Sequence, residues 1–224
     1  MTSIEDFLFI ILSVLILIIS VSIHESAHAW TANKLGDPTA KHLGRISLNP
    51  FVHIDPVGTV LVPILLLLVN LPLVGWAKPT PFNPWNLSNP RRDSALISFA
   101  GPLSNFFVAT MLSIFFRMGL LSFISPFGTG SDFSVLGPIE RFSVIASLAL
   151  ILNLILGIFN LLPIAPLDGF KVVAGILPRD LALRWSEFER IGPLVLIAVI
   201  FFGGQILSPI IFGVLRFFLQ ILIG

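Results

Sequence analysis

The sequence predicts an all-α, multi-pass membrane protein, a bundle of about 4–6 transmembrane helices. Of its 224 residues, 55% are hydrophobic and only 11% are charged. Soluble domains carry about 25% charged residues, so this chain cannot cover its surface with charge. Several apolar runs approach the roughly 17–25 residues that a helix needs to cross the hydrocarbon layer.

Three long apolar helices are expected, over residues 7–36, 91–121 and 139–163. The first ends at Gly-Asp-Pro, because glycine and a following proline are typical of a helix C-terminus. A C-terminal helical region covers 191–223 and is interrupted by Gly203, Gly204 and Pro209. This region is expected to form either one span with an interfacial helix or two spans.

A re-entrant or extended segment is predicted at about 57–85. Its apolar part, 57–74, is short and contains Pro63, Asn70 and Pro72. The following stretch, GWAKPTPFNPWN, is rich in proline, and each residue before a proline is pushed towards extended geometry. We expect 57–74 to enter the membrane and return, since non-helical backbone is tolerated at depth where protein covers it.

The motif HESAHAW places two histidines and a glutamate inside the first apolar helix. Residues four apart share a helix face, so His24 and His28 can hold one metal ion, with Glu25 beside it. This is the His-Glu-x-x-His arrangement, in which two imidazoles bind zinc and the glutamate activates water. Such side chains cost about 2.5–3.5 kcal/mol each inside a bilayer, and a shared cation offsets that cost. Buried, mutually bonded histidines are the alternative.

A catalytic zinc normally takes three protein ligands, and thiolates are excluded because the chain has no cysteine. We favour Asp168 as the third ligand, because it follows a predicted span in an apolar setting, NLLPIAPLDGF. An Asp-Gly turn is the alternative for this residue. The other acidic and histidine candidates are His42, His53, Asp55, Asp93, Asp132, Glu140, Asp180, Glu187 and Glu189.

Two of these motifs together, HESAHAW and NLLPIAPLDG, resemble the site-2 protease family of intramembrane zinc metalloproteases. Three further stretches, GRISLNPFVHIDPVGT, GWAKPTPFNP and AGPLSN, resemble its short bacterial members, and the likeness covers about residues 20–175. The resemblance implies hydrolysis of peptide bonds within the bilayer with one Zn²⁺ per chain. It implies that His24, His28 and Asp168 bind this ion and that Glu25 is the catalytic base.

Two asparagines also match positions of the family. Asn160 matches an Asn-x-x-Pro element that ends at Pro163, and Asn105 matches a recurrent polar position in the middle span. Their amide groups are candidates for holding the substrate backbone or the developing oxyanion. Hydrogen bonding between helices is the alternative.

We expect one intramembrane metalloprotease domain over 1–224, with a core at 20–175 and the helical region 191–223, and without PDZ or CBS domains. The expected partners are the lipid bilayer and a transmembrane protein or peptide substrate. The net charge of +1 gives no basic surface for nucleic acid, and nothing in the sequence indicates an oligomeric state. The expected location is the cell membrane, with the active site nearer the cytoplasmic side, because most Lys and Arg then face the cytoplasm.

The alternative function is a membrane metal-binding transporter or scaffold without protease activity. Intramembrane His and Asp also mark ion pathways. Transporter folds are typically built from internal repeats, and the sequence shows none. That function also leaves Glu25 without a role.

Overall fold

The structure is a computed structural model that describes residues 4–62, 76–126, 133 and 135–224. Within these residues the regular elements are all helical and no strand occurs. The long helices are α1 (Ile4–Lys34), α4 (Pro90–Arg117), α5 (Pro138–Asn160) and α9 (Gly204–Leu222). The shorter ones are α2 (Thr39–His42), η1 (Pro50–Val52), η2 (Pro56–Leu61), η3 (Pro84–Asn86), α6 (Asp168–Ile176), α7 (Arg179–Glu187), η4 (Phe188–Arg190) and α8 (Gly192–Phe202).

Four described helices, α1, α4, α5 and α9, are long and apolar enough to cross a membrane. The predicted all-α, multi-pass membrane architecture is confirmed. In the C-terminal region, α8 and α9 meet at Gly203, so the predicted interruption lies at the glycine pair. Only α9 has the length of a full span, whereas α8 has 11 residues.

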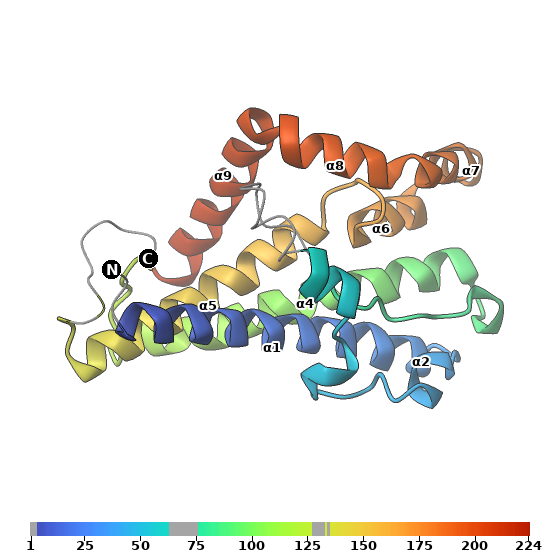
Figure 1. Ribbon diagram of the computed structural model, residues 1–224. Helices are drawn as coiled ribbons and strands as arrows, with labels where there is room; N and C mark the ends of the chain where they lie inside the picture. The colour runs from blue at the N-terminus through green and yellow to red at the C-terminus, as the bar shows by residue number, and fades with distance from the viewer. Residues whose placement is uncertain (1–3, 63–75, 127–132, 134) are drawn as a thin grey trace.

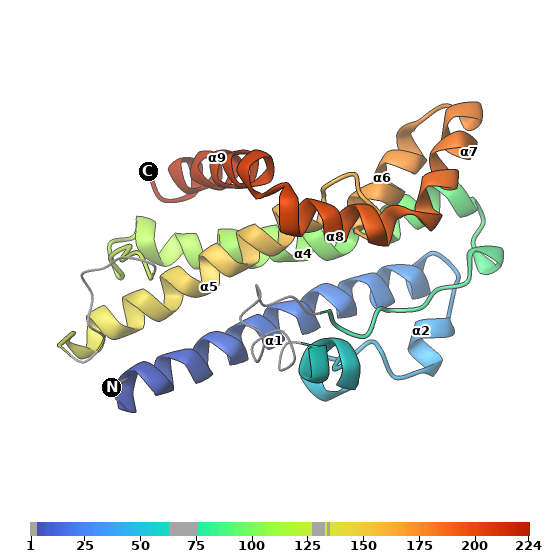
Figure 2. The same ribbon diagram turned by 45° about the horizontal axis from the view of Figure 1, so that its top comes forward.

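Helix α4 is at the centre of the bundle and contacts α1, α5, α6 and α9. Figures 1 and 2 show α1 on one side of α4 and α5, and α9 on the other side. The largest apolar core cluster lies among α4, α5 and α9, around Ala109, Leu150, Leu154 and Leu215. Helices α1 and α5 run in the same direction and α4 runs against them, so the last turns of α1 meet the first half of α4.

Local sequence signals set the helix ends. Helix α4 begins at Pro90, and the side chain of Asn89 accepts a hydrogen bond from the backbone N–H of Arg92. A proline at the first helical position loses no helix bond, since its missing N–H would have no partner there. Helix α1 ends just before Gly36, whose φ of 109° is the left-handed conformation that glycine adopts without strain. The structure therefore ends α1 next to the Gly-Asp-Pro sequence, as predicted.

The carboxylate of Asp37 fixes the next part of the chain against the end of α1. It is fully buried and accepts hydrogen bonds from the Thr39 hydroxyl (2.5 Å), the Asn83 backbone N–H (2.6 Å) and the Asn86 amide (2.7 Å). Burial raises the pKa of Asp37, but these bonds outweigh that effect and hold it below its ordinary value. The carboxylate therefore stays ionised and joins two segments that are distant in sequence.

The predicted re-entrant segment, 57–74, lies largely outside the described residues, and its path through the membrane remains a prediction. Its beginning is the short helix η2. The proline-rich stretch 76–83 has no regular secondary structure. Alternate residues of this stretch donate to one side, since Trp76 N–H bonds to the Gly58 carbonyl (3.2 Å) and Lys78 N–H to the His53 carbonyl (2.9 Å). That alternation is typical of extended backbone.

This topology predicts which positions share a membrane face. Single cysteines replacing Lys41, Arg91 and Ser186 should all react with a membrane-impermeant maleimide from the same face. These exposed residues belong to α2, the first turn of α4 and α7, and Figure 1 shows these three parts at one end of the bundle. A cysteine replacing Leu120, which is 58% exposed just beyond α4, should react only from the opposite face. The chain contains no cysteine, so labelling has no background. Labelling of Lys41→Cys and Arg91→Cys from opposite faces would show that 57–74 crosses the membrane.

Candidate metal centre

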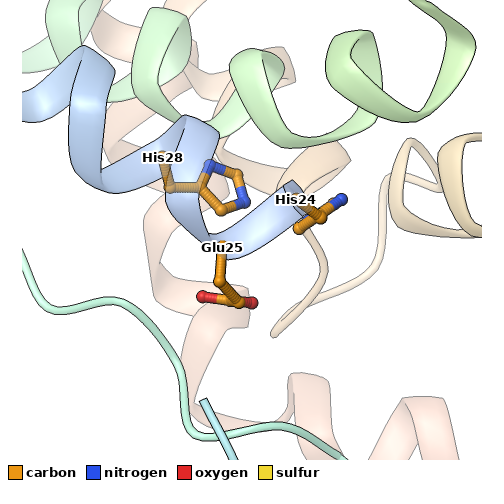
Figure 3. A group of neighbouring side chains, drawn as sticks. All are labelled: His24, Glu25 and His28. Atoms are coloured by element: carbon orange, nitrogen blue, oxygen red, sulfur yellow. The ribbon is translucent and has the colours of Figure 1, made fainter. Parts of the chain in front are cut away.

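Helix α1 stays regular through the His-Glu motif and places both histidines on one face. His24 and His28 are one turn apart, 5% and 7% exposed, and their rings meet edge-on with centroids 4.6 Å apart. Figure 3 shows both rings on this part of α1 with the Glu25 carboxylate beside them. One potential ligand atom from each of the three residues lies within 4.8 Å of the others.

Asp168, the first residue of α6, brings a carboxylate to the same point. Its Oδ2 atom lies 3.0 Å from His24 Nε2 and 3.3 Å from His28 Nε2. Zinc bonds of 2.0–2.1 Å in a tetrahedron imply ligand atoms about 3.3 Å apart, so the spacing fits. An aspartate binds a metal in its ionised carboxylate form, so Asp168 can contribute an oxygen to a cation at this point.

The opposite nitrogen of each ring identifies the tautomer. His28 Nδ1 lies 2.7 Å from the Ile97 carbonyl and His24 Nδ1 lies 2.6 Å from Asn105 Oδ1. Both oxygens only accept, so each Nδ1 carries the hydrogen and each neutral ring turns the Nε2 lone pair inward. Two nitrogen lone pairs and a carboxylate oxygen then converge on one point. Such a set suits a cation, and two imidazoles with one carboxylate are a ligand set that zinc accepts.

Gly101 of α4 leaves space at this point. A Cβ atom at residue 101 would lie 2.4 Å from His28 Nε2 and 2.5 Å from His24 Nε2. No real Cβ makes contacts that short, so any side chain here would displace the histidines or fill the place of an ion. Glycine at this position therefore leaves free the space that an ion between the two rings would need.

The orientation of Asn105 is fixed by a second asparagine that the sequence analysis missed. Asn105 is fully buried, and its amide donates to Asn153 Oδ1 (2.9 Å) and to the Ser20 carbonyl (3.3 Å). Asn153 in turn donates to the Ser20 hydroxyl at 2.9 Å. The network joins α1, α4 and α5 and forces Asn105 Oδ1 towards His24. The detectable signal was an asparagine inside an apolar run, LALILNLIL.

Glu25 is positioned by a different part of the chain. Its Oε2 atom accepts a hydrogen bond from the backbone N–H of Thr80 (2.8 Å), and the Thr80 hydroxyl donates to the Glu25 carbonyl at 3.1 Å. Thr80 lies between Pro79 and Pro81, which have no N–H, so it is the only backbone donor of this tripeptide. Thr80 was also missed, and its signal was the Pro-Thr-Pro sequence.

The remaining predicted site residues lie differently. Asn160, the last residue of α5, donates to the carbonyl of Leu156 one turn earlier, at 2.9 Å. The structure therefore brings Asn105 to the histidines and shows Asn160 bonded within its own helix. Other candidate ligands have local roles. Asp55 accepts from backbone N–H groups at the start of η2, Asp93 accepts from the Asn89 N–H, and the His53 ring bonds to the Ser47 carbonyl.

Comparison with known proteins identifies the family. The profile described as "Peptidase family M50" matches residues 12–203, a range that contains both histidines, Glu25 and Asp168. The chain belongs to peptidase family M50. The resemblance to the site-2 protease family is thereby confirmed at the level of the family.

Individual relatives of this M50 peptidase are similar over most of its length. "Putative zinc metalloprotease YwhC" of Bacillus subtilis is 36% identical over 203 residues, which cover 88% of this chain and 84% of that protein. Proteins named "Putative zinc metalloprotease Rip2" are 27% identical in Mycolicibacterium smegmatis and 28% identical in Mycobacterium tuberculosis. These matches cover 82% and 88% of this chain but only 64% and 66% of the two relatives. No solved structure matches the chain.

The hydrogen bond between His24 Nδ1 and Asn105 Oδ1 predicts that Asn105 influences the zinc affinity of the site. Asn105→Leu removes the acceptor of the His24 N–H, so zinc affinity, measured by competition with a chelator, should fall about 10–100-fold. Asn160→Leu is the matched control and should leave zinc affinity unchanged, since within the described residues the Asn160 side chain bonds to the Leu156 carbonyl of its own helix. If Asn105→Leu binds zinc normally while peptide hydrolysis falls, Asn105 contacts the substrate instead.

Proposed function

We propose that this M50 peptidase is a zinc-dependent intramembrane endopeptidase, with Glu25 as the general base. The observation that supports this most strongly is the convergence of two imidazole nitrogens and one carboxylate oxygen, 3.0–3.3 Å apart, at the end of a helix long enough to span a membrane. Relatives that cover most of the chain are named as zinc metalloproteases.

His24, His28 and Asp168 would hold the ion. A zinc ion supplies Lewis-acid polarisation of the scissile carbonyl and increases the acidity of water. Glu25 is the nearest carboxylate that the ion does not require, so it is free to accept a proton from the attacking water and to deliver it to the leaving amine. Thr80 holds only Oε2 of Glu25, which leaves Oε1 for this transfer.

The substrate is a membrane-protein segment that must be extended at the cleavage point, because helical carbonyls are engaged in the helix's own hydrogen bonds. The amide of Asn160 remains a candidate for contact with this extended chain. The site is proposed to lie nearer the cytoplasmic side. Basic residues gather at the bundle end that holds it, and such clusters mark the cytoplasmic face. They are Lys34, Lys41, Arg91, Arg92, Lys171, Arg179, Arg184 and Arg190.

Glu25→Gln should abolish proteolysis without loss of zinc. The amide cannot accept the proton from water, and general-base catalysis contributes about 10²–10⁴-fold. Cleavage of a reconstituted transmembrane peptide and zinc content should be measured on the same preparation. Glu189→Gln, the same change at an exposed position in η4, is the control and should retain activity. Substantial cleavage by zinc-loaded Glu25→Gln would exclude Glu25 as the base.

Asp168→Ala should lower both zinc occupancy and cleavage, because the site loses one of three protein ligands. Asp180→Ala, at an exposed residue in the first turn of α7, is the matched control. Atomic absorption on the purified proteins gives the metal stoichiometry. Unchanged zinc in Asp168→Ala would show that Asp168 is not a ligand, and zinc binding without any peptide cleavage by the native chain would favour a metal-binding scaffold.

A further inference from the structure

Helix α9 carries its polar side chains on the face that is turned away from the protein. Its apolar face packs against the core cluster shared with α4 and α5, through Ile211, Leu215, Phe218, Leu219 and Leu222. Spacings of three and four residues place a second set together on another face of the helix. This set, here called the polar face, consists of Gln205, Pro209, Gly213, Arg216 and Gln220, all of them exposed.

The α8–α9 segment runs from one end of the bundle to the other. At its start, Gly192 packs against Ala165, close to the metal centre. At its end, Arg117 of α4 donates to the carbonyls of Leu222 (Nε, 2.9 Å) and Ile221. The α9 helix, with 19 residues, is about 28 Å long. Because α9 is long and apolar enough to cross a membrane, a spanning α9 would hold the polar face at hydrocarbon depth. An amphipathic helix with its polar side outward is unfavourable there unless something covers it.

The side chains of Arg216 and Gln220 form no hydrogen bond or ion pair within the described part of the chain. Arg216 lies six residues before the end of α9, about 9 Å along the axis. Helical side chains lean towards the helix N-terminus, which here points away from the nearer membrane surface. A lipid phosphate at that surface is thus a poor partner, whereas a group at the depth of Arg216 is a good one.

We propose that the polar face of α9 is a docking surface for another transmembrane helix that presents a carboxylate to Arg216. A guanidinium binds a carboxylate through two parallel hydrogen bonds. A Cβ atom at Gly213 would meet nothing within 4 Å, so a partner backbone can approach closely at this point, as small residues allow in membrane helix pairs. Gln220 supplies a second hydrogen-bonding group one turn further along.

A second copy of this chain fits the polar face less well. Helix α9 contains no acidic residue, and a two-fold arrangement of identical faces would bring two guanidinium groups together. The partner is therefore a different chain. It would dock on the side of α4 and α5 opposite to α1 (Figure 2), so it would not compete with a substrate for the space beside Glu25.

The test uses the full-length protein in phosphatidylcholine vesicles, with a fluorescent donor on Gly224→Cys. Three acceptor-labelled polyleucine helices differ only in carrying Glu, Gln or Leu at the depth of Arg216. The Glu peptide should associate at least about fivefold more tightly than the Leu peptide, in line with a polar contact between membrane helices. Arg216→Leu should remove this preference, and Arg216→Lys should retain part of it. Ile210→Leu, at an exposed α9 position outside the polar face, should leave the preference intact.

Zinc content verifies that each variant is folded, and Arg216→Gln replaces Arg216→Leu if the latter fails this check. Equal association of the Glu and Leu peptides with the native chain overturns the proposal. So does a preference that phosphatidylglycerol abolishes, since Arg216 then binds a lipid phosphate. Finally, rapid labelling of Gly213→Cys by an aqueous maleimide, at the rate of Ser186→Cys, would place the polar face in water.

Discussion

The most demanding feature of the structure is the convergence of three lone pairs on one point within an apolar bundle, an arrangement that the proposed zinc ion would stabilise. His24 Nε2, His28 Nε2 and Asp168 Oδ2 lie 3.0–3.3 Å apart, and without positive charge between them they repel. Helices α4 and α6 both contribute to the arrangement at this point. Helix α4 supplies a glycine where a side chain would fill the space, and it supplies the Ile97 carbonyl that sets one tautomer. Helix α6 begins at the aspartate.

Polar residues inside the bundle form a chain of hydrogen bonds that leads to this centre. Asn105 contacts a ligand histidine, and Asn153 and Ser20 contact Asn105 without reaching the ligands. Each bond satisfies a group that would otherwise be unpaired in an apolar environment, and each also fixes the next group inward. The same bonds join α1, α4 and α5, so the network both stabilises the packing of the three helices and orients the ring of His24, a proposed metal ligand. Replacement of any one of these polar residues with leucine would weaken both the packing of the three helices and the orientation of the His24 ring.

The sequence predicted those parts of the fold and site that depend on local pattern. Composition and apolar length indicated the spanning helices, and the four-residue spacing placed His24 and His28 on one face. Asp168 was favoured from its apolar context, and the structure places it at the histidines. Thr80 and Asn153 could not be assigned in this way, because their importance comes from contacts with residues 55 and 48 positions away. The function of Asn105 was assigned towards substrate from a resemblance, whereas its hydrogen bond to His24 appears only in three dimensions.

Two separate parts of the chain position the proposed metal ligands and the proposed base. The face of α1 with His24 and His28 lies against α4 and α6, whereas Glu25 is held by Thr80 of the extended stretch 76–83. That stretch is fixed further along by Asp37, which accepts from Asn83 and Asn86. The carboxylates of Glu25, in α1, and of Asp37, just beyond α1, therefore both accept hydrogen bonds from the backbone of this extended stretch. Pro79 and Pro81 have no backbone N–H. If the stretch slid along α1 by one residue, no neighbouring N–H could therefore replace that of Thr80 as the donor to Glu25. The side chain of the proposed base is thus held by a short backbone segment outside the helical bundle, whereas the proposed metal ligands are held by contacts within the bundle.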